Sequence, residues 1–171
     1  MSLILLPFNN KTRLIFNSIS KNIGLIGVDY LAYTIETESG SYYYSSNAIW
    51  QELYTGKNLA KKDPIHVRAR GGTPYLRWDA LPGGSPMLNI MELQCKICQI
   101  FDGFSIMSQS NHGVEIISLG TSHQPLDITR KILQNIETFK EIKDWMSQIA
   151  KDQCTLETTE SFPEAALKRA G

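Results

Sequence analysis

The alternation of apolar and polar residues predicts a layered arrangement of helices and strands. In residues 11–23 the apolar side chains recur at helical spacing, which predicts a first helix that ends at Gly24. Residues 25–37 are rich in β-branched and aromatic types, and their apolar side chains point to both faces of an extended strand. The two faces carry Leu31, Tyr33 and Ile35, and Val28, Tyr30 and Ala32. A strand that is apolar on both faces needs a covering layer on each side.

The middle of the chain alternates between short elements and broken stretches. Turn-forming residues at 38–41 precede a short tyrosine-rich strand at 42–44. Asn47 suits the N-cap of a short helix that runs to about Gly56. Residues 57–88 hold so many prolines and glycines that they predict an irregular segment wrapped around something, with no long element.

The last third of the chain predicts two helices and two strands. Residues 89–101 have a helical apolar face, and residues 103–108 and 114–121 are predicted as strands joined by a turn. Asp127 is predicted to cap one long amphipathic helix that reaches at least Ile149. This order of elements predicts an α+β fold, with helices packed on both sides of an antiparallel sheet.

Length and composition narrow the class of protein. A chain of 171 residues with 42% hydrophobic content suits one domain, which we place at residues 1–150, followed by a polar tail or linker at 151–171. Seventeen basic residues balance seventeen acidic ones, which argues against strong general attraction to nucleic acid or to a membrane surface. Three cysteines, no signal-peptide pattern and no run of about 18 apolar residues predict a cytoplasmic protein.

Motifs for catalysis or for metal binding are lacking in the sequence. There is no nucleophile-elbow, phosphate-loop or dinucleotide-binding pattern, so we do not expect an enzyme. Cys95 and Cys98 form a C-x2-C pair inside a predicted helix, without a convincing second ligand pair for zinc. We therefore expect neither a metal nor a cofactor.

Aromatic and acidic residues in the middle of the chain form the candidate binding set. Trp50 and Tyr54 lie four apart on the predicted short helix and so share one face, and Asp63 and Trp78 follow in the broken segment. An indole N–H donor, a hydroxyl and a carboxylate acceptor suit a neutral amphipathic ligand with carbonyl groups and an amide N–H. From the residue types alone, the alternative is that both tryptophans are core residues and Asp63 is a cap.

The spacing of these four residues resembles the ligand-sensing domain of LuxR-type quorum-sensing regulators. Three, eight and fourteen residues separate Trp50, Tyr54, Asp63 and Trp78. Gly103 resembles the family's glycine at the start of a strand, and the resemblance covers about residues 10–150. It implies a GAF/PAS-like α-β-α sandwich, with a central antiparallel sheet of about five strands, which encloses an N-acyl-homoserine lactone.

By this resemblance the ligand contacts can be assigned. Trp50 would donate its indole N–H to the lactone carbonyl, Asp63 would accept from the amide N–H, Tyr54 would contact the acyl chain or a carbonyl, and Trp78 would close over the lactone ring. Three further residues complete the expected ligand-binding set: Ser46, where the family commonly has a tyrosine, Ser118 on the strand at 114–121, and Tyr33. Met107 replaces a proline that the family commonly has. These departures leave the identity of the ligand open.

The family's helix-turn-helix domain has no counterpart in the sequence, since residues 151–171 are too few for it. Either the sequence ends at the domain boundary or the natural protein is the sensing domain alone, and in both cases this chain would not contact DNA itself. It would regulate transcription through an attached or partner DNA-binding domain, as a homodimer or heterodimer. The alternative is a protein-interaction module that pairs with and inhibits a full-length LuxR-type regulator through the helix bearing Trp145 and Met146. A third possibility is a collapsed pocket in which Trp50 and Trp78 are core residues.

Overall fold

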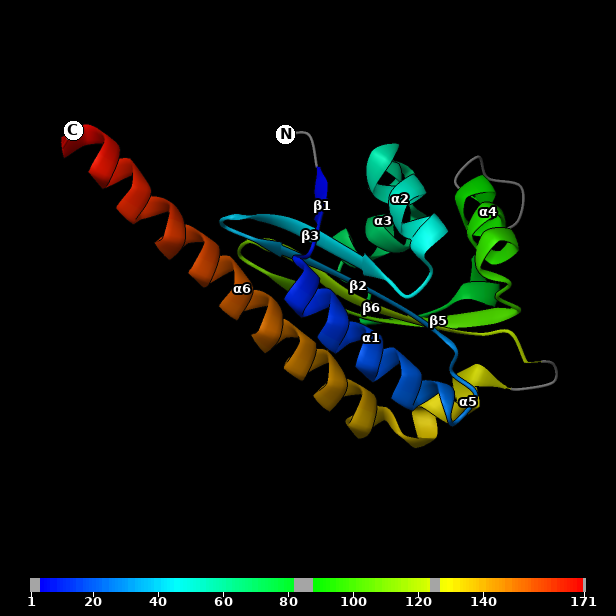
Figure 1. Ribbon diagram of the computed structural model, residues 1–171. Helices are drawn as coiled ribbons and strands as arrows, with labels where there is room; N and C mark the ends of the chain where they lie inside the picture. The colour runs from blue at the N-terminus through cyan, green and yellow to red at the C-terminus, as the bar shows by residue number, and fades with distance from the viewer. Residues whose placement is uncertain (1–3, 82–87, 124–126, 171) are drawn as a thin grey trace.

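One twisted sheet with helices on both faces forms the body of the molecule (Figure 1). The computed structural model describes residues 4–81, 88–123 and 127–170, and gives only the backbone course of residues 88, 89 and 154–170. Residues 82–87, which belong to the predicted irregular segment, lie outside the described residues. The α+β class and the covering of both faces, predicted from the sequence, are confirmed.

The sheet has six strands in the described part of the chain, one more than predicted. Their order is β1-β3-β2-β6-β5-β4, and every neighbouring pair is antiparallel except β1 with β3. The strands are β1 (Leu5–Pro7), β2 (Tyr30–Thr37), β3 (Gly40–Ser45), β4 (Tyr75–Arg77), β5 (Asp102–Ser110) and β6 (Gly113–Thr121). The predicted strand at 25–37 is thus shorter, because Leu25 to Asp29 form a turn and an extended link between α1 and β2.

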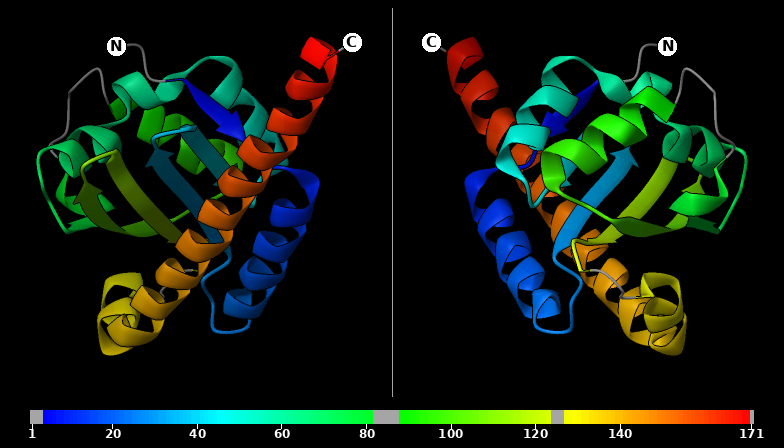
Figure 2. Two further views of the ribbon diagram at one scale, coloured as in Figure 1. Left: turned by 90° about the vertical axis from the view of Figure 1, so that its left-hand side faces the viewer. Right: turned by 90° about the vertical axis from the view of Figure 1, so that its right-hand side faces the viewer.

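One face of the sheet is covered by three helices: α1 (Asn10–Gly24), α5 (Ile128–Gln134) and α6 (Ile136–Ala170) (Figures 1 and 2). Phe16 and Ile19 of α1 and Phe139 of α6 pack there against Leu31 and Tyr33 of β2. The predicted single helix after Asp127 is interrupted at Asn135, so it forms two helices. Residues 151–170, predicted as a tail or linker, continue α6.

The opposite face carries the helices that hold the predicted site. They are α2 (Ala48–Gly56), α3 (Pro64–Arg70) and α4 (Leu88–Cys98), with two short 3-10 helices, η1 (Leu59–Lys62) and η2 (Trp78–Ala80). Tyr30 and Ala32 of β2 face this layer, as the alternation predicted, whereas Val28, which precedes the strand, belongs to the cluster on the opposite face. Trp50, Tyr54 and Trp78 belong to the same buried cluster.

Candidate ligand-binding site

Trp50 and Tyr54 form an aromatic wall on α2. The Asn47 side chain begins this helix by accepting from the backbone N–H of Trp50 (2.9 Å), as the sequence predicted. The two rings lie on one face, 5.6 Å apart, and Tyr54 stacks on Tyr43 of β3 at 4.2 Å. Trp50 is 0% exposed, and its indole Nε1 has no hydrogen-bond partner among the described residues. A buried donor without an acceptor costs about 1–3 kcal/mol, which marks this atom as one that a ligand could satisfy.

Asp63 links α2 to α3 through both of its carboxylate oxygens. Oδ1 accepts from the Ile65 N–H (2.8 Å) and caps α3, while Oδ2 accepts from the Tyr54 hydroxyl (2.5 Å). The side chain is only 5% exposed, so these bonds offset much of its desolvation. Asp63 is therefore a helix cap, as the alternative drawn from residue types predicted, and its carboxylate also contacts Tyr54 of the predicted polar set.

The pKa of Tyr54 is raised well above its ordinary value. Burial is the largest cause, and the negative charge of Asp63 and the hydrogen bond to it act in the same direction. The hydroxyl therefore stays protonated at physiological pH and keeps donating to Asp63.

Trp78 begins a second polar chain, which runs across the sheet. Its Nε1 donates to the Ser105 hydroxyl (2.9 Å), which is 2.8 Å from the Ser118 hydroxyl on the neighbouring strand. The Trp78 ring lies directly over Gly103, where an added Cβ would be 2.2 Å from the indole ring. The glycine at this position thus has a steric reason: it leaves room for the tryptophan.

A small enclosed cavity lies between the sheet and the helices α2, α3 and α4. Its free volume is about 10 Å³, which is about the room that one water molecule needs. Of the predicted residues, Tyr54, Asp63 and Ser118 line it, whereas Trp50 and Trp78 pack in the surrounding cluster. Its lining consists of Ala32, Thr34, Tyr43, Tyr54, Asp63, Ile65, His66, Gln94, Ile116 and Ser118.

Two predicted residues do not join this set. Tyr33 lies on the opposite face of the sheet, where its hydroxyl donates to Glu115 (2.6 Å) and its ring packs against Phe16. Strand alternation forces this placement, because its neighbours Tyr30 and Ala32 in β2 point toward the site. Ser46 is half-buried, and its hydroxyl accepts from the backbone N–H of Leu31 (3.0 Å), so it secures the beginning of β2.

Three residues at or next to the cavity were not predicted as site residues from the sequence. Gln94 and His66 line the cavity, and Ser105 connects Trp78 to Ser118. Gln94 had a readable signal, since it is a polar residue on the apolar face of the helix at 88–98, four positions after Ile90. His66 and Ser105 had none, because their roles depend on how distant segments pack.

An open cleft of about 1140 Å³ lies beside this cavity, at the end of the sheet formed by the β2–β3 and β5–β6 turns. His66 lines both the cleft and the cavity. At the cleft, Glu36 forms an ion pair with Arg70, accepts from the Val114 N–H (3.2 Å) and lies 3.7 Å from His66 Nε2. Glu36 thereby holds α3 against this end of the sheet.

Glu36 is expected to make stability depend on pH. Burial would raise its pKa, but the nearby His66 ring, the charge of Arg70 and the Val114 N–H together hold it below the ordinary value. A lowered pKa stabilises the folded state above the unfolded pKa of about 4.3, and this stability is lost as the pH falls through the folded pKa. We expect Glu36→Gln to lower the free energy of unfolding at pH 7 by about 1 kcal/mol, since Arg70 is half-exposed.

Urea unfolding at a series of pH values checks this. The difference between the wild type and Glu36→Gln should shrink steadily as the pH falls from about 5 to about 3. Glu38→Gln is the matched control, because Glu38 is 82% exposed in its side chain and should give no such difference. Parallel stability curves for the wild type and Glu36→Gln would contradict the expectation.

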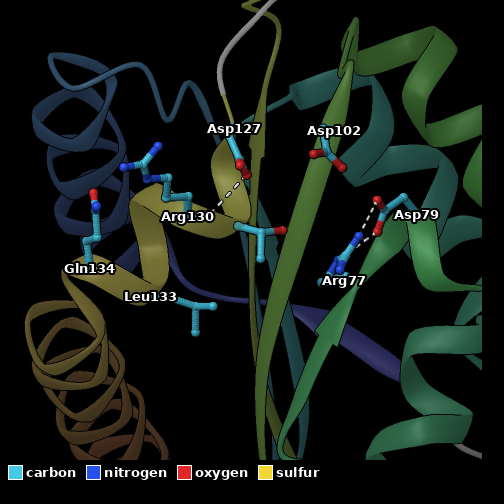
Figure 3. A pocket seen from close by; sticks show the side chains of 8 residues that line it. Arg77, Asp79, Asp102, Asp127, Arg130, Leu133 and Gln134 are labelled. Carbon is cyan, nitrogen blue, oxygen red and sulfur yellow. Dashed lines mark hydrogen bonds and ion pairs between the residues drawn. The ribbon is translucent and has the colours of Figure 1, made fainter.

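A second open cleft, of about 740 Å³, lies between α5 and the strands β4 and β5 (Figure 3). The ion pair of Arg77 with Asp79 (2.8 Å) lies beside Asp102 on the strand side of this cleft, and Asp127 caps α5 on the other side. Burial raises the pKa of Asp102, and the charges of Asp79 and Asp127 add to this effect, while the Gly103 N–H opposes it. None of the predicted site residues lines this cleft.

The described residues offer neither a metal site nor a membrane-spanning helix. Among the side chains described, no group of three or more His, Cys, Asp or Glu residues is arranged to hold a metal ion. Cys95 and Cys98 are free thiols on α4, and burial, with the proximity of Cys95, raises the pKa of Cys98 to about 12. No helix in the described ranges has both the length and the apolar character needed to cross a bilayer.

Comparison with known proteins identifies the fold. No protein-family model matches the sequence, and no curated protein matches it either. Among solved structures, CepR2 from Burkholderia cenocepacia, an N-acylhomoserine lactone-dependent LuxR-family transcription factor, is similar with a TM-score of 0.58 at 15% identity. The match covers 86% of this chain and 87% of that one.

A second solved structure, SdiA from Escherichia coli, is similar with a TM-score of 0.50 at 11% identity. The match covers 84% of this chain but only 59% of the SdiA chain, so this chain spans less than two thirds of that protein. At these identities the likeness establishes the fold. This chain therefore has the fold of the LuxR-family protein CepR2, and the resemblance inferred from the spacing of its aromatic and acidic residues is confirmed at the level of the fold.

Proposed function

We propose that this chain is a sensing domain that binds an N-acyl-homoserine lactone or a similar acyl signal between the sheet and the helices α2, α3 and α4. The observation that carries the proposal is the indole N–H of Trp50, which is fully buried and lacks an acceptor among the described residues. A ligand carbonyl would supply that acceptor and recover about 1–3 kcal/mol of unmet hydrogen bonding.

The surroundings of Trp50 suit the rest of such a ligand. Tyr54 and Tyr43 offer stacked aromatic faces for an apolar chain, and Asp63 offers a carboxylate for an amide N–H. The fold is that of CepR2, which depends on an N-acylhomoserine lactone. By this proposal the domain acts on transcription through a DNA-binding domain, attached to it or carried by a partner.

Binding requires the site to open. Pockets for small ligands usually measure about 300–1,000 Å³, whereas the cavity here has room for about one water. The helices α2, α3 and α4 must therefore move away from the sheet to admit an acyl chain. The ligand would favour this open state because only that state satisfies its contacts, and it would become part of the core on binding.

A stand-alone interaction module is the second candidate, favoured by the small cavity and by the surface of α6. Trp145 on α6 is 55% exposed, which is unusual for so large an apolar side chain. Met146, predicted to share that surface, is instead fully buried against the sheet. Under this candidate the chain would pair with a LuxR-type regulator through Trp145, and Trp145→Ala would abolish co-purification of the two proteins without changing the fold.

Thermal unfolding with a panel of acyl-homoserine lactones tests the sensing proposal. A ligand at about 100 times its Kd adds about 2.7 kcal/mol, which corresponds to a rise of about 5–10 °C in Tm for a domain of this size. In Trp50→Phe we expect the shift to fall by more than half, because the donor is gone. The stability without ligand should change by only about 1 kcal/mol, because removing an unpaired N–H offsets part of the lost packing.

Trp145→Phe is the control, because Trp145 lies far from the cavity on an exposed helix face and should keep the full shift. If no lactone raises the Tm of the wild type, the sensing proposal fails. If Trp50→Phe responds as the wild type does, Trp50 is a core residue only.

A further inference from the structure

Gln94 is a buried polar side chain within the apolar layer of α4. It is 3% exposed, it lines the cavity, and its neighbours Ile90 and Met91 on the same helix belong to the hydrophobic cluster. A primary amide at such a position is costly unless both its donor and its acceptor atoms are satisfied. In Gln94 only the donor, Nε2, is satisfied.

The orientation of the Gln94 amide is held by β2. Its Nε2 donates to the Tyr30 hydroxyl (2.9 Å), and the Ser45 hydroxyl contacts the same oxygen at 3.3 Å. Burial raises the pKa of Tyr30 far above its ordinary value, so this phenol stays neutral. Gln94 Oε1 is buried and has no hydrogen-bond partner among the described residues.

Among the residues that line the cavity, two side-chain atoms lack a hydrogen-bond partner in the described part of the chain: Gln94 Oε1, and His66 Nε2, which lies 3.7 Å from Glu36. The Tyr54 hydroxyl already donates to Asp63, and the Ser118 hydroxyl pairs with Ser105. Gln94 Oε1 therefore remains as an acceptor in need of a donor, in a space of about 10 Å³ that fits a single oxygen atom with its proton.

The geometry points to Gln94 as a specificity-determining residue that accepts a hydrogen bond from a hydroxyl group on the ligand. This inference rests on the proposed sensing function and deepens it, because it names a second donor beyond the amide N–H that Asp63 would bind. The ligand class is a hydroxylated acyl amide. Tyr30 is the positioning residue, since its hydroxyl fixes which amide atom faces the cavity.

Calorimetric titration with two matched lactones tests this. The pair has the same acyl-chain length and differs by one hydroxyl group on that chain, and the hydroxyl position is varied along the chain. At the hydroxyl position that reaches Gln94, we expect the wild type to bind the hydroxylated lactone about tenfold more tightly than the lactone without the hydroxyl. The lactone without the hydroxyl leaves the buried Gln94 acceptor unpaired. In Gln94→Met, which has similar volume but lacks the acceptor, the ratio should fall to about one.

Three controls separate the outcomes. Gln94→Glu keeps acceptor oxygens and should retain a preference for the hydroxylated lactone, whereas Tyr30→Phe leaves Gln94 in place but unoriented and should reduce the preference. Gln94→Leu replaces Gln94→Met if the latter does not give a wild-type circular dichroism spectrum. Because the readout is a ratio of affinities, a uniform loss of binding does not imitate the expected result.

Equal binding of both lactones by the wild type, at every hydroxyl position, would overturn the inference about Gln94 while leaving the sensing function intact. It would mean that the cavity holds a buried water only. If neither lactone binds, the sensing proposal itself fails, and the assignment of Gln94 fails with it. A preference that persists unchanged in Gln94→Met would assign the hydroxyl to another residue and would also overturn the inference.

Discussion

Gly103→Ala should lower the free energy of unfolding by about 3 kcal/mol. The new Cβ would lie 2.2 Å from the ring of Trp78, which is a rigid side chain in a buried cluster and has little room to withdraw. Overpacking of this kind costs about 1–3 kcal/mol, and displacing the ring also breaks the hydrogen bond from Trp78 Nε1 to Ser105. Urea unfolding followed by circular dichroism measures the loss.

Gly24→Ala is the matched control for this change. Gly24 is the last residue of α1, and an added Cβ there meets nothing within 4 Å. Alanine is the better helix former, so we expect Gly24→Ala to be neutral or to stabilise the protein by about 0.5 kcal/mol. Equal effects of the two alanines would show that Trp78 does not pack over Gly103 as described.

Asp63→Ala is expected to cost about 3 kcal/mol in the free energy of unfolding. The substitution removes the N-cap of α3, worth about 1 kcal/mol, and it leaves the buried Tyr54 hydroxyl without its acceptor, worth about 1–3 kcal/mol more. The loss arises from two separate hydrogen bonds of one carboxylate, so it should exceed the effect of Tyr54→Phe, which removes only one of them.

Asp63→Asn provides the comparison that isolates the hydrogen bonds from the charge. Asparagine caps helices about as well as aspartate, and its carbonyl oxygen can still accept one hydrogen bond. We expect it to cost less than half as much as Asp63→Ala in the same urea experiment. If Asn and Ala destabilise equally, the charge of Asp63, and not its two acceptor contacts, holds α2 to α3.

Much of the fold was readable from the sequence, because the signals involved were local. The helical period of residues 11–23 predicted α1, and Asn47 predicted the start of α2. The apolar alternation along β2 predicted layers on both faces, and the same alternation would have placed Tyr33 away from Trp50 had it been applied to the site. Strand alternation by itself therefore separates Tyr33 from the layer of helices that holds Trp50.

The elements that were not predicted depend on distant contacts or on brief local signals. β1 and β4 have three residues each and exist through pairing with β3 and β5, respectively. A three-residue strand has too short a pattern to predict from sequence alone. α3, in contrast, carried a readable start, with Asp63 as the N-cap and Pro64 at the first helical position, which the many neighbouring prolines and glycines obscured.

The candidate site was predicted in part. The spacing predicted that Trp50 and Tyr54 share one helix face. In the structure Trp78 packs in the same layer, and Asp63 accepts from Tyr54 there. The size of the cavity was beyond prediction, because it depends on how the side chains of α2, α3, α4 and the sheet fill the space between them. The unpaired atoms of Trp50 and Gln94 became visible for the same reason only once the packing was known.

The indole proton signal of Trp50 in a nuclear magnetic resonance titration tests the central claim most directly. If an acyl lactone binds where we propose, its carbonyl accepts from Trp50 Nε1, so saturating ligand should shift this signal strongly and slow its exchange with water. The indole signal of Trp145, which is exposed on α6, should stay unchanged. A lactone that stabilises the protein while the Trp50 signal remains where it was would contradict the account.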